Sequence, residues 1–478
     1  MRRRLWALVV AAVVVLGGPA PLAGAGTAQA APATIANATQ FTTTSGEAVH
    51  AHGGGVIKVG AYYYWFGENR NADNTFRYVS AYRSTDLKSW EFRRHVLTQA
   101  TNPELASANI ERPKVLYNER TKQFVMWMHK ENGSDYSEAR AAVATSATVD
   151  GGYTWRGSFR PLDQHMSRDI TLFEDSDGTG YMISAARENY DLQIYRLTDD
   201  YTGVASLVAN PWPGGHREAP ALFKRGNVYF MLTSGATGWS PNQQQYATAT
   251  SLAGPWSAMR NVGDATAYGS QTAYVLPVQG AQATSYLYLG DRWGNSFGGK
   301  VNDSRYVWLP LAFPTATTMT MDWYPQLTID TEAGTVTGSG GPYTTLKARH
   351  SGKCADVVSA SQTDGTAVVQ YTCNGGGNQL FWSRSAGGGY VQLIARHSSQ
   401  CLTVAGGSTA DGAAVVQSAC GTGANQQWQA TDTGSGYVRL AARSSGKCLD
   451  VADSSTADKA ALVQWSCTGG ANQQWQRG

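Results

Sequence analysis

Cysteine is absent from the first 350 residues of this 478-residue chain, which excludes a disulfide framework or a cysteine-based metal site there. All six cysteines follow, with a spacing of 19 residues within a pair and 47 residues from pair to pair. Six cysteines permit many connectivities, but a 47-residue repeat favours one disulfide in each repeat. The expected pairs are Cys354 with Cys373, Cys401 with Cys420, and Cys448 with Cys467.

Charged residues are also scarce, at 15% of the chain, and the formal net charge is only +3. Three arginines at positions 2–4 precede an apolar run over residues 5–16 and small residues at 28–30, an order typical of a secretory signal. We expect residues 1–30 to be removed and the mature protein to be secreted and extracellular, starting near Ala31. The mature chain is then nearly neutral and has no other apolar run of membrane-spanning length, which excludes nucleic acid and a membrane as partners.

Helical periodicity is almost absent over stretches longer than about ten residues. Between residues 31 and 337 one unit instead recurs five times: a polar head, an apolar strand, a Gly/Asn/Asp turn, and an aromatic or β-branched strand. Further strand-like phrases follow the first four units. Four strands per unit and five units at about 50-residue spacing predict an all-β fold with a five-bladed β-propeller over residues 31–337.

The polar heads of these units carry the candidate catalytic residues. The first strand of every propeller blade lines the central channel, so Glu111, Asp169, Glu218 and Gln271 are expected to converge. Carboxylates brought together repel one another and raise the pKa of at least one of them, which keeps a general acid protonated near neutral pH. Structural alternatives exist: Glu111 and Glu218 each stand beside an arginine and would form an ordinary ion pair, and Asp169 would cap a turn.

These heads and their strands resemble family 43 of the glycoside hydrolases. The segments YYYWFGENR, ERPKVLYN, SRDITLFEDSDGTGYMI, REAPALFKRGNVYFMLTSGATGW and GSQTAYVLP look like its exo-β-1,3-galactanase branch, over essentially all of 31–337. The resemblance implies an inverting enzyme that removes galactose from the non-reducing end of β-1,3-galactan and bypasses β-1,6 side chains. It implies that Glu218 is the general acid and that Asp169 tunes its pKa. The residues implied to hold the terminal galactose are Glu111, Glu68 and Tyr136.

The first head departs from the pattern of most family 43 enzymes, which place an aspartate there as the general base. This chain has His52 followed by three glycines. The galactanase branch shares the departure, and the resemblance points to Gln271 as the residue that acts on the attacking water. An amide is too weakly basic to take a proton outright, so Gln271 would position water through its carbonyl oxygen or act as an imidic tautomer. Glu111 is the rival for the role of base.

Three similar repeats follow a Gly/Ser linker, GSGGP, at residues 338–342. Each repeat ends in an aromatic residue (Phe381, Trp428 or Trp475), and units this short must share one core. The repeats resemble the ricin-B-type β-trefoil, family 13 carbohydrate-binding modules, over residues 343–478. The resemblance implies one sugar site in the first repeat and one in the third, each with an Asp, an aromatic residue and an Asn. These residues are Asp356, Tyr371, Asn378, Asp450, Trp465 and Asn472.

The middle repeat has Thr403 and Ser418 at the Asp and aromatic positions, and we expect it to be scaffold only. The alternative for Asp356 and Asp450 is that they merely cap turns. The expected partner is a polysaccharide, β-1,3-galactan or arabinogalactan, and the expected state is a monomer. No metal-ligand spacing stands out among the eight histidines and no cysteine is spare, so no metal and no cofactor is expected.

Two other functions fit parts of the sequence. A galactan-binding lectin would explain the trefoil and the missing first-head aspartate, but the carboxylates at the other heads argue against it. Another family 43 specificity, α-L-arabinofuranosidase or β-xylosidase, fits the propeller equally well. Those enzymes use the aspartate that this chain lacks, so the galactanase interpretation is preferred.

Overall fold

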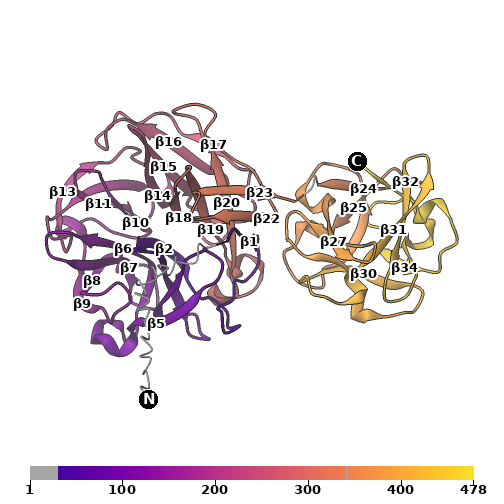
Figure 1. Ribbon diagram of the computed structural model, residues 1–478, viewed down its shortest axis with the longest axis horizontal. Helices are drawn as coiled ribbons and strands as arrows, with labels where there is room; N and C mark the ends of the chain where they lie inside the picture. Colours follow the sequence, from indigo (N-terminus) through magenta and orange to yellow (C-terminus); the bar gives the residue numbers. More distant parts are fainter. Residues whose placement is uncertain (1–30, 341–342) are drawn as a thin grey trace, which may run out of the picture.

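The computed structural model describes residues 31–340 and 343–478, which form two lobes that lie side by side (Figure 1). The expected signal peptide, residues 1–30, lies outside the described residues, as do positions 341–342 of the expected linker. No α-helix occurs in the described part of the chain, where strands are interrupted only by short 3-10 turns, and none of these turns is long and apolar enough to cross a membrane. The turns are η1 (Gln99–Thr101), η2 (Pro103–Leu105), η3 (Pro161–Asp163), η4 (Gly294–Phe297), η5 (Val301–Asp303), η6 (Val358–Ala360), η7 (Gly377–Gln379), η8 (Ala405–Gly407), η9 (Ala424–Gln426), η10 (Ala452–Ser454) and η11 (Ala471–Gln473).

Five antiparallel sheets of four consecutive strands each make up most of the first lobe. Their first strands contact one another in the order β2, β6, β10, β14, β18, and β18 contacts β2 again, so the sheets close a ring. A ring of radially repeated four-stranded sheets is the architecture of a β-propeller. The strands are β2 (His52–Val59), β3 (Tyr62–Arg70), β4 (Phe76–Ser84), β5 (Glu91–Thr98), β6 (Asn109–Asn118), β7 (Gln123–Glu131), β8 (Arg140–Ser146), β9 (Thr154–Phe159), β10 (Ile170–Glu174), β11 (Gly180–Ala186), β12 (Asp191–Leu197), β13 (Val204–Ala209), β14 (Arg217–Arg225), β15 (Val228–Gly235), β16 (Gln244–Ala249), β17 (Arg260–Val262), β18 (Gln271–Gln279), β19 (Thr284–Arg292), β20 (Arg305–Ala312) and β21 (Thr320–Met321).

The core of this lobe lies between neighbouring sheets. Each of its five buried apolar clusters combines side chains from two adjacent sheets. Between the fifth and the first sheet, for example, Leu289 and Trp308 pack with Trp65 and Trp90. Aromatic side chains bury large areas and dominate such interfaces, which accounts for much of the aromatic content of the sequence.

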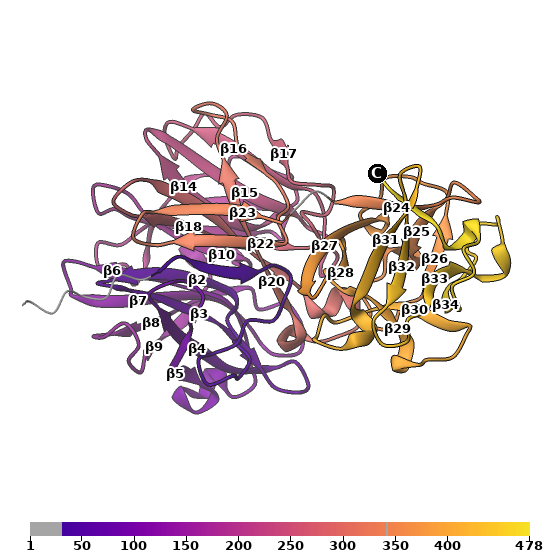
Figure 2. The ribbon, with the colours of Figure 1, turned by 45° about the vertical axis from the view of Figure 1, so that its right-hand side comes forward.

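A small three-stranded sheet brings together the first and last segments of the chain in the first lobe. Strand β1 (Ala33–Ala36) pairs with β22 (Gln326–Asp330), which pairs with β23 (Thr335–Ser339). In Figure 2, β22 and β23 lie side by side in the first lobe, and the antiparallel pairing makes β23 the strand that leads on toward the second lobe. Gly338 and Ser339, which the sequence placed in the linker, are therefore paired residues of β23.

The second lobe consists of the three repeats around one shared core that includes Phe381, Trp428 and Trp475, as predicted. The first and last strands of the lobe, β24 and β35, pair with each other and close it. The three predicted disulfides are confirmed, each with a Cα–Cα distance of 5.1 Å. The strands are β24 (Thr344–Ala348), β25 (Cys354–Val357), β26 (Val368–Tyr371), β27 (Leu380–Gly387), β28 (Tyr390–Ala395), β29 (Cys401–Val404), β30 (Ala413–Ser418), β31 (Trp428–Gly434), β32 (Tyr437–Ala442), β33 (Cys448–Val451), β34 (Leu462–Trp465) and β35 (Trp475–Arg477).

Candidate active site

The inner ends of the propeller strands surround a cavity of about 330 Å³, here called the funnel. All the propeller residues predicted for the site line it, namely Glu68, Glu111, Tyr136, Asp169, Glu218 and Gln271. The remaining lining residues are Arg70, Arg112, His129, Arg168, Glu188, Asn189, Ala236, Gly238, Trp239 and Trp293. The volume is at the small end of the roughly 300–1,000 Å³ typical of small-molecule sites, and its walls combine carboxylates, arginines and aromatic rings.

A β-bulge lies near the head of four of the five inner strands. The pairing register shifts within the first few residues of β2, β6, β14 and β18. In two of these bulges Arg112 and Ala219 adopt left-handed φ angles of 53° and 50°. A bulge bends its strand and redirects side chains, so in β6, β14 and β18 the distortion helps to turn the head residue into the funnel. Strained backbone of this kind is typical of functional sites.

Glu218 is 6% exposed and accepts a hydrogen bond on each carboxyl oxygen. Gln271 Nε2 donates to Oε1 at 2.9 Å, and Asn189 Nδ2 donates to Oε2 at 2.9 Å. Burial, and then the charge of Asp169, raise the pKa of Glu218 to about 8, against the lowering effect of Arg112. Glu218 is therefore protonated at neutral pH, which is the state that a general acid requires.

Asp169 precedes β10 and makes two contacts with the neighbouring sheets. Its Oδ2 accepts the backbone N–H of Ala219 at 2.9 Å, and its Oδ1 lies 2.8 Å from Nε of Arg112. The first contact fixes the backbone next to Glu218. Both partners are distant from Asp169 in sequence, so its side chain does not cap a local turn.

The ion pairs that the sequence allowed between neighbouring residues are not formed. Arg217 donates from Nε to Thr233 Oγ1 at 2.9 Å, and Arg112 pairs with Asp169. Strand alternation directs Arg217 away from Glu218. The bulge instead leaves Arg112 in the funnel beside Glu111, but turned to Asp169 of the next sheet. Glu111 and Glu218 are consequently held by residues from other strands.

Gln271 uses all the hydrogen-bonding capacity of its amide. Its Oε1 accepts Nη2 of Arg112 at 2.6 Å and Nε1 of Trp293 at 2.8 Å. Its Nε2 donates to Glu218 and to Ser234 Oγ, both at 2.9 Å. Two donors on Oε1 fix which end of the amide faces Glu218. They also disfavour the imidic tautomer, in which this oxygen would itself carry a proton.

Glu68 and Glu111 form a second cluster around Arg70. Arg70 Nη2 donates to Glu68 Oε2 at 2.8 Å and to Glu111 Oε1 at 2.7 Å, and Tyr136 Oη donates to Glu111 Oε1 at 2.9 Å. Burial alone would raise the pKa of Glu111, but Arg70 and then His129 hold it well below its usual range. Glu111 is thus an ionised carboxylate with little basicity, suited to accept hydroxyl groups.

A possible cation site coincides with this cluster. One ligand atom each from Glu111, His129 and Asp169 lie within 4.8 Å of one another. Burial alone would lower the pKa of His129, but the carboxylates of Glu111 and Glu131 raise it to about 9. A metal ion would therefore meet a protonated imidazole, as well as the guanidinium groups already paired with both acids. The charge of this group argues against a metal.

His52, where most family 43 enzymes have an aspartate, does not line the funnel. It is fully buried, and its Nδ1 lies 3.0 Å from Oδ1 of Asp291, whose Oδ2 accepts the backbone N–H of Gly53 at 2.8 Å. The ring of His52 stacks on Tyr306. The first head is therefore a structural support, and the funnel receives no carboxylate from it.

Sequence analysis missed five funnel residues that complete this geometry: Arg70, Arg112, Asn189, Trp239 and Trp293. Arg70 ends the motif YYYWFGENR and Arg112 directly follows Glu111 in ERPKVLYN, so an arginine close to a predicted site acid was a usable signal. Trp239 and Trp293 pack edge to face, with ring centroids 5.2 Å apart, and form an aromatic wall. Asn189 lies in a loop with left-handed φ, where no sequence motif marked it.

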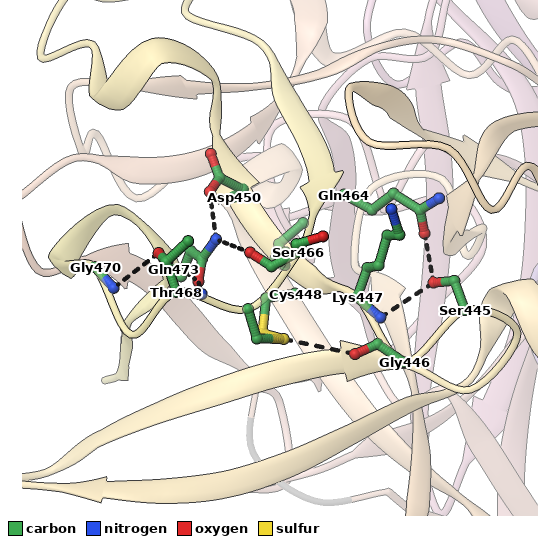
Figure 3. The surroundings of a disulfide bond; sticks show 12 residues. Ser445, Gly446, Lys447, Cys448, Asp450, Gln464, Ser466, Thr468, Gly470 and Gln473 are labelled. Carbon is green, nitrogen blue, oxygen red and sulfur yellow. Dashed lines mark hydrogen bonds between the residues drawn. A yellow bond between two sulfur atoms is a disulfide. The ribbon is translucent and has the colours of Figure 1, made fainter.

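In the third repeat of the second lobe, the predicted sugar-site residue Asp450 lies beside Gln473, near the disulfide of the repeat (Figure 3). Asp450 Oδ2 accepts Nε2 of Gln473 at 2.7 Å and Nδ2 of Asn472 at 3.0 Å. Trp465 is 45% exposed, as a ring that stacks on a ligand must be. Figure 3 also shows Gln473 donating to the backbone of Ser466, next to the Cys448–Cys467 disulfide, which fixes the position of the amide.

The first repeat orients its aspartate in a similar way, and the middle repeat has no aspartate at this position. Asp356 Oδ2 accepts Nε2 of Gln379 at 2.8 Å, and Asn378 donates to the backbone of Val357 at 3.0 Å. Burial raises the pKa of Asp356, as it does for Asp450. In the middle repeat Thr403 Oγ1 donates to its own strand instead. An oriented carboxylate therefore exists in two repeats of three.

Comparisons with known proteins agree with this geometry. The model for glycosyl hydrolases family 43 matches residues 51–276, and the ricin-type β-trefoil lectin domain matches residues 342–475. Among solved structures, an exo-β-1,3-galactanase from Clostridium thermocellum is 47% identical, covers 93% of this chain and 99% of its own, and has a TM-score of 0.66. No curated protein matches the chain.

Two further solved structures contain bound sugars or analogues. An exo-β-1,3-galactanase from Phanerochaete chrysosporium, in a complex with β-1,3-galactotriose, is 28% identical, covers 93% of this chain and 92% of its own, and has a TM-score of 0.63. A family 43 β-1,3-galactosidase with galactodeoxynojirimycin is 33% identical, covers 61% of this chain and 99% of its own, and has a TM-score of 0.57. The chain therefore belongs to family 43 of the glycosyl hydrolases and carries a ricin-type β-trefoil lectin domain.

Proposed function

We propose that the protein is an exo-acting hydrolase that releases galactose from the non-reducing end of β-1,3-galactan, the main chain of arabinogalactan. The observation that carries the proposal is Glu218, a buried acid with a pKa of about 8, at the wall of a funnel of about 330 Å³. Relatives that span nearly the whole chain act on or bind β-1,3-linked galactose.

The reaction we infer is a single displacement with inversion. Glu218 donates its proton to the glycosidic oxygen as the bond to the anomeric carbon breaks, and a water molecule attacks that carbon from the opposite face and loses a proton to the base on that face. Asp169 keeps Glu218 protonated and fixes the adjacent backbone. Glu68, Glu111 and Tyr136 hold the terminal galactose, and side chains on the 6-positions stay outside and are bypassed.

We assign to Gln271 the role of positioning the water that attacks the anomeric carbon. Both lone pairs of its Oε1 accept N–H groups from Arg112 and Trp293. Holding a water therefore requires one of these donors to shift when sugar enters, and Trp293, at the aromatic wall, is the one we propose. The amide must also separate from Glu218, which its Nε2 contacts at 2.9 Å, because the acid of an inverting enzyme lies about 6.5–9.5 Å from the group that activates the water. Glu111 stays the rival base, but its lowered pKa makes it a poor acceptor of a proton.

We propose a domain organisation close to the one expected from the sequence. The five sheets are the five blades of a propeller over residues 31–337, the linker expected at 338–342 is shortened by Gly338 and Ser339, which pair in β23, and the trefoil over 343–478 binds galactan. Three disulfides support an extracellular location, because such bonds persist in oxidising compartments. A mature protein that is recovered from the medium as a monomer by light scattering, with its N-terminus near Ala31, would establish this part.

The basic limb of the pH profile should report Glu218. Because only the protonated acid is active, kcat/KM is expected to fall as pH rises through about 8. Asp169→Asn removes a charge that raises the pKa of Glu218, so the limb should move to lower pH. The measurement is the pH dependence of kcat/KM on β-1,3-galactobiose for both proteins. An unshifted limb would remove Asp169 from the role of pKa modulator.

If the aspartates of the first and third trefoil repeats bind sugar, their replacement should weaken galactan binding, and the equivalent change in the middle repeat should not. The double variant Asp356→Ala with Asp450→Ala removes the oriented carboxylate from both repeats, and its affinity for insoluble β-1,3-galactan should fall by about tenfold or more. Thr403→Ala, the equivalent change in the middle repeat, should leave the affinity as it was. Equal affinities of the double variant and the wild type in a depletion assay would show that these aspartates only cap turns.

The activity itself is tested by incubation with linear β-1,3-galactan and analysis of the products. Galactose as the sole early product supports an exo-galactanase, whereas release from arabinan or xylan alone would support another family 43 specificity.

A further inference from the structure

The trefoil contacts the propeller through an arginine that occupies the same position in each of its three repeats. Arginines recur 47 residues apart, at 349, 396 and 443. Arg349 and Arg443 each donate to a glutamine of the trefoil at 2.6 Å and lie over a tyrosine of the trefoil. These glutamines are Gln474 and Gln427, and the equivalent residue near Arg396 is Leu380, whose side chain cannot accept a hydrogen bond. Arg396 lies instead over the ring of Tyr268, 5.5 Å from the centroid, in the propeller.

A groove of about 620 Å³ runs beside this contact, between the two lobes. Its propeller wall includes Tyr268 and Phe297, and its trefoil wall includes Gln362 and Asn378. Asn378 belongs to the predicted sugar site of the first repeat. The groove therefore reaches the edge of that site, whose other two residues, Asp356 and Tyr371, do not line it.

The same two propeller loops border both the groove and the funnel. In one loop Trp239 lines the funnel and Pro241 lines the groove; in the other, Trp293 lines the funnel and Phe297 lines the groove. Gly294–Phe297 is the 3-10 turn η4, and at about 2 Å per residue it spans only about 8 Å. A polymer whose end is in the funnel needs to cross only this rim to reach the groove.

The chemistry of the groove suits a neutral polyhydroxyl chain. Its two charged side chains, Arg396 and Asp264, lie 4.0 Å apart and compensate each other. Serine, threonine and amide groups make up much of the rest, and Gln362 Oε1 is a buried acceptor with no partner among the described residues. The half-buried ring of Phe297 offers an apolar face to a sugar.

We propose that this groove is a subsite for the galactan chain whose end is being hydrolysed, so that the first trefoil repeat binds the same polymer molecule as the funnel. The inference rests on the proposed function. The third repeat, whose sugar-site residues do not line the groove, is then free to hold a different chain.

Symmetry of the trefoil supplies a matched test. Thr363 lines the groove, and Ala457 is its exposed equivalent in the third repeat, with the same backbone contact to a serine two residues earlier. Thr363→Trp fills the groove, and Ala457→Trp adds the same ring elsewhere. For long β-1,3-galactan, Thr363→Trp should raise KM by about tenfold, the loss of one good sugar contact, while Ala457→Trp leaves KM unchanged. The KM for β-1,3-galactobiose, which is too short to reach the groove, should be that of the wild type in both variants.

The same KM for galactan in the two variants would overturn the groove proposal. If Thr363→Trp does not fold, Ala265→Trp fills the groove from the propeller wall and decides the matter in the same way. A wild-type protein that does not hydrolyse galactobiose would contradict the proposed function instead. The difference in galactan affinity between the two tryptophan variants, measured by calorimetry, would then still decide whether the groove binds the polymer.

Discussion

Replacing Glu218 by glutamine is expected to lower kcat on β-1,3-galactan by roughly 10²- to 10⁴-fold, the usual contribution of a general acid. The amide cannot donate the proton that the leaving oxygen needs. The fold should be retained, because Asn189 Oδ1 has no hydrogen-bond partner in the described part of the chain and can turn to accept the new amide N–H.

The measurement is kcat together with the affinity for β-1,3-galactobiose. Affinity should stay within a few-fold of the wild type, because Glu68, Glu111 and Tyr136 still hold the sugar. The variant should also be the more stable protein above pH 8. There the wild type must carry a buried charge at Glu218, whose raised pKa favours the folded state only while it is protonated. Turnover near that of the wild type would remove Glu218 from the role of acid.

Substitution of Gln271 is expected to have the second-largest effect. Gln271→Ala leaves the buried donors of Arg112 and Trp293 without an acceptor and frees Glu218 Oε1. We expect a fall in kcat of about 10²-fold or more, since water positioning and acid orientation are lost together. Thermal stability should fall as well, because each orphaned buried donor costs about 1–3 kcal/mol.

Two further variants separate the candidates for the base. Gln271→Glu restores an acceptor for Arg112 and Trp293 and should recover activity above that of Gln271→Ala if this position acts on the water. Glu111→Gln keeps the acceptor for Arg70 and Tyr136 and should mainly raise KM. The opposite pattern, an active Gln271→Ala beside an inactive Glu111→Gln, would identify Glu111 as the base.

The positions of the acids could be predicted because they depend on local order along the chain. A polar residue before an inner strand is expected to face the channel of a propeller, and this holds for Glu111, Asp169, Glu218 and Gln271, although not for His52. Their hydrogen-bond partners could not be predicted in this way. The pairing of Arg112 with Asp169 depends on how neighbouring sheets are rotated about the channel and on the bulge at Arg112.

In the trefoil, too, the repeated features could be predicted from the sequence but one contact between distant residues could not. Its 47-residue period was enough to predict three disulfides and a shared aromatic core. The departure of Leu380 from that period was visible in the sequence, but its consequence was not. Only the structure shows that Arg396, released from the usual glutamine, contacts Tyr268 of the propeller.

The most direct test of the account is proton NMR of the reaction with linear β-1,3-galactan from its earliest minutes, when the anomeric form of the product has not yet equilibrated. The account predicts that galactose is the first product and that it appears as the α-anomer, because water attacks a β-linked sugar from the opposite face. Initial release of β-galactose would contradict the single displacement and require a nucleophile in the funnel. No release of galactose, with galactan still bound, would contradict the assignment of Glu218 and favour a lectin.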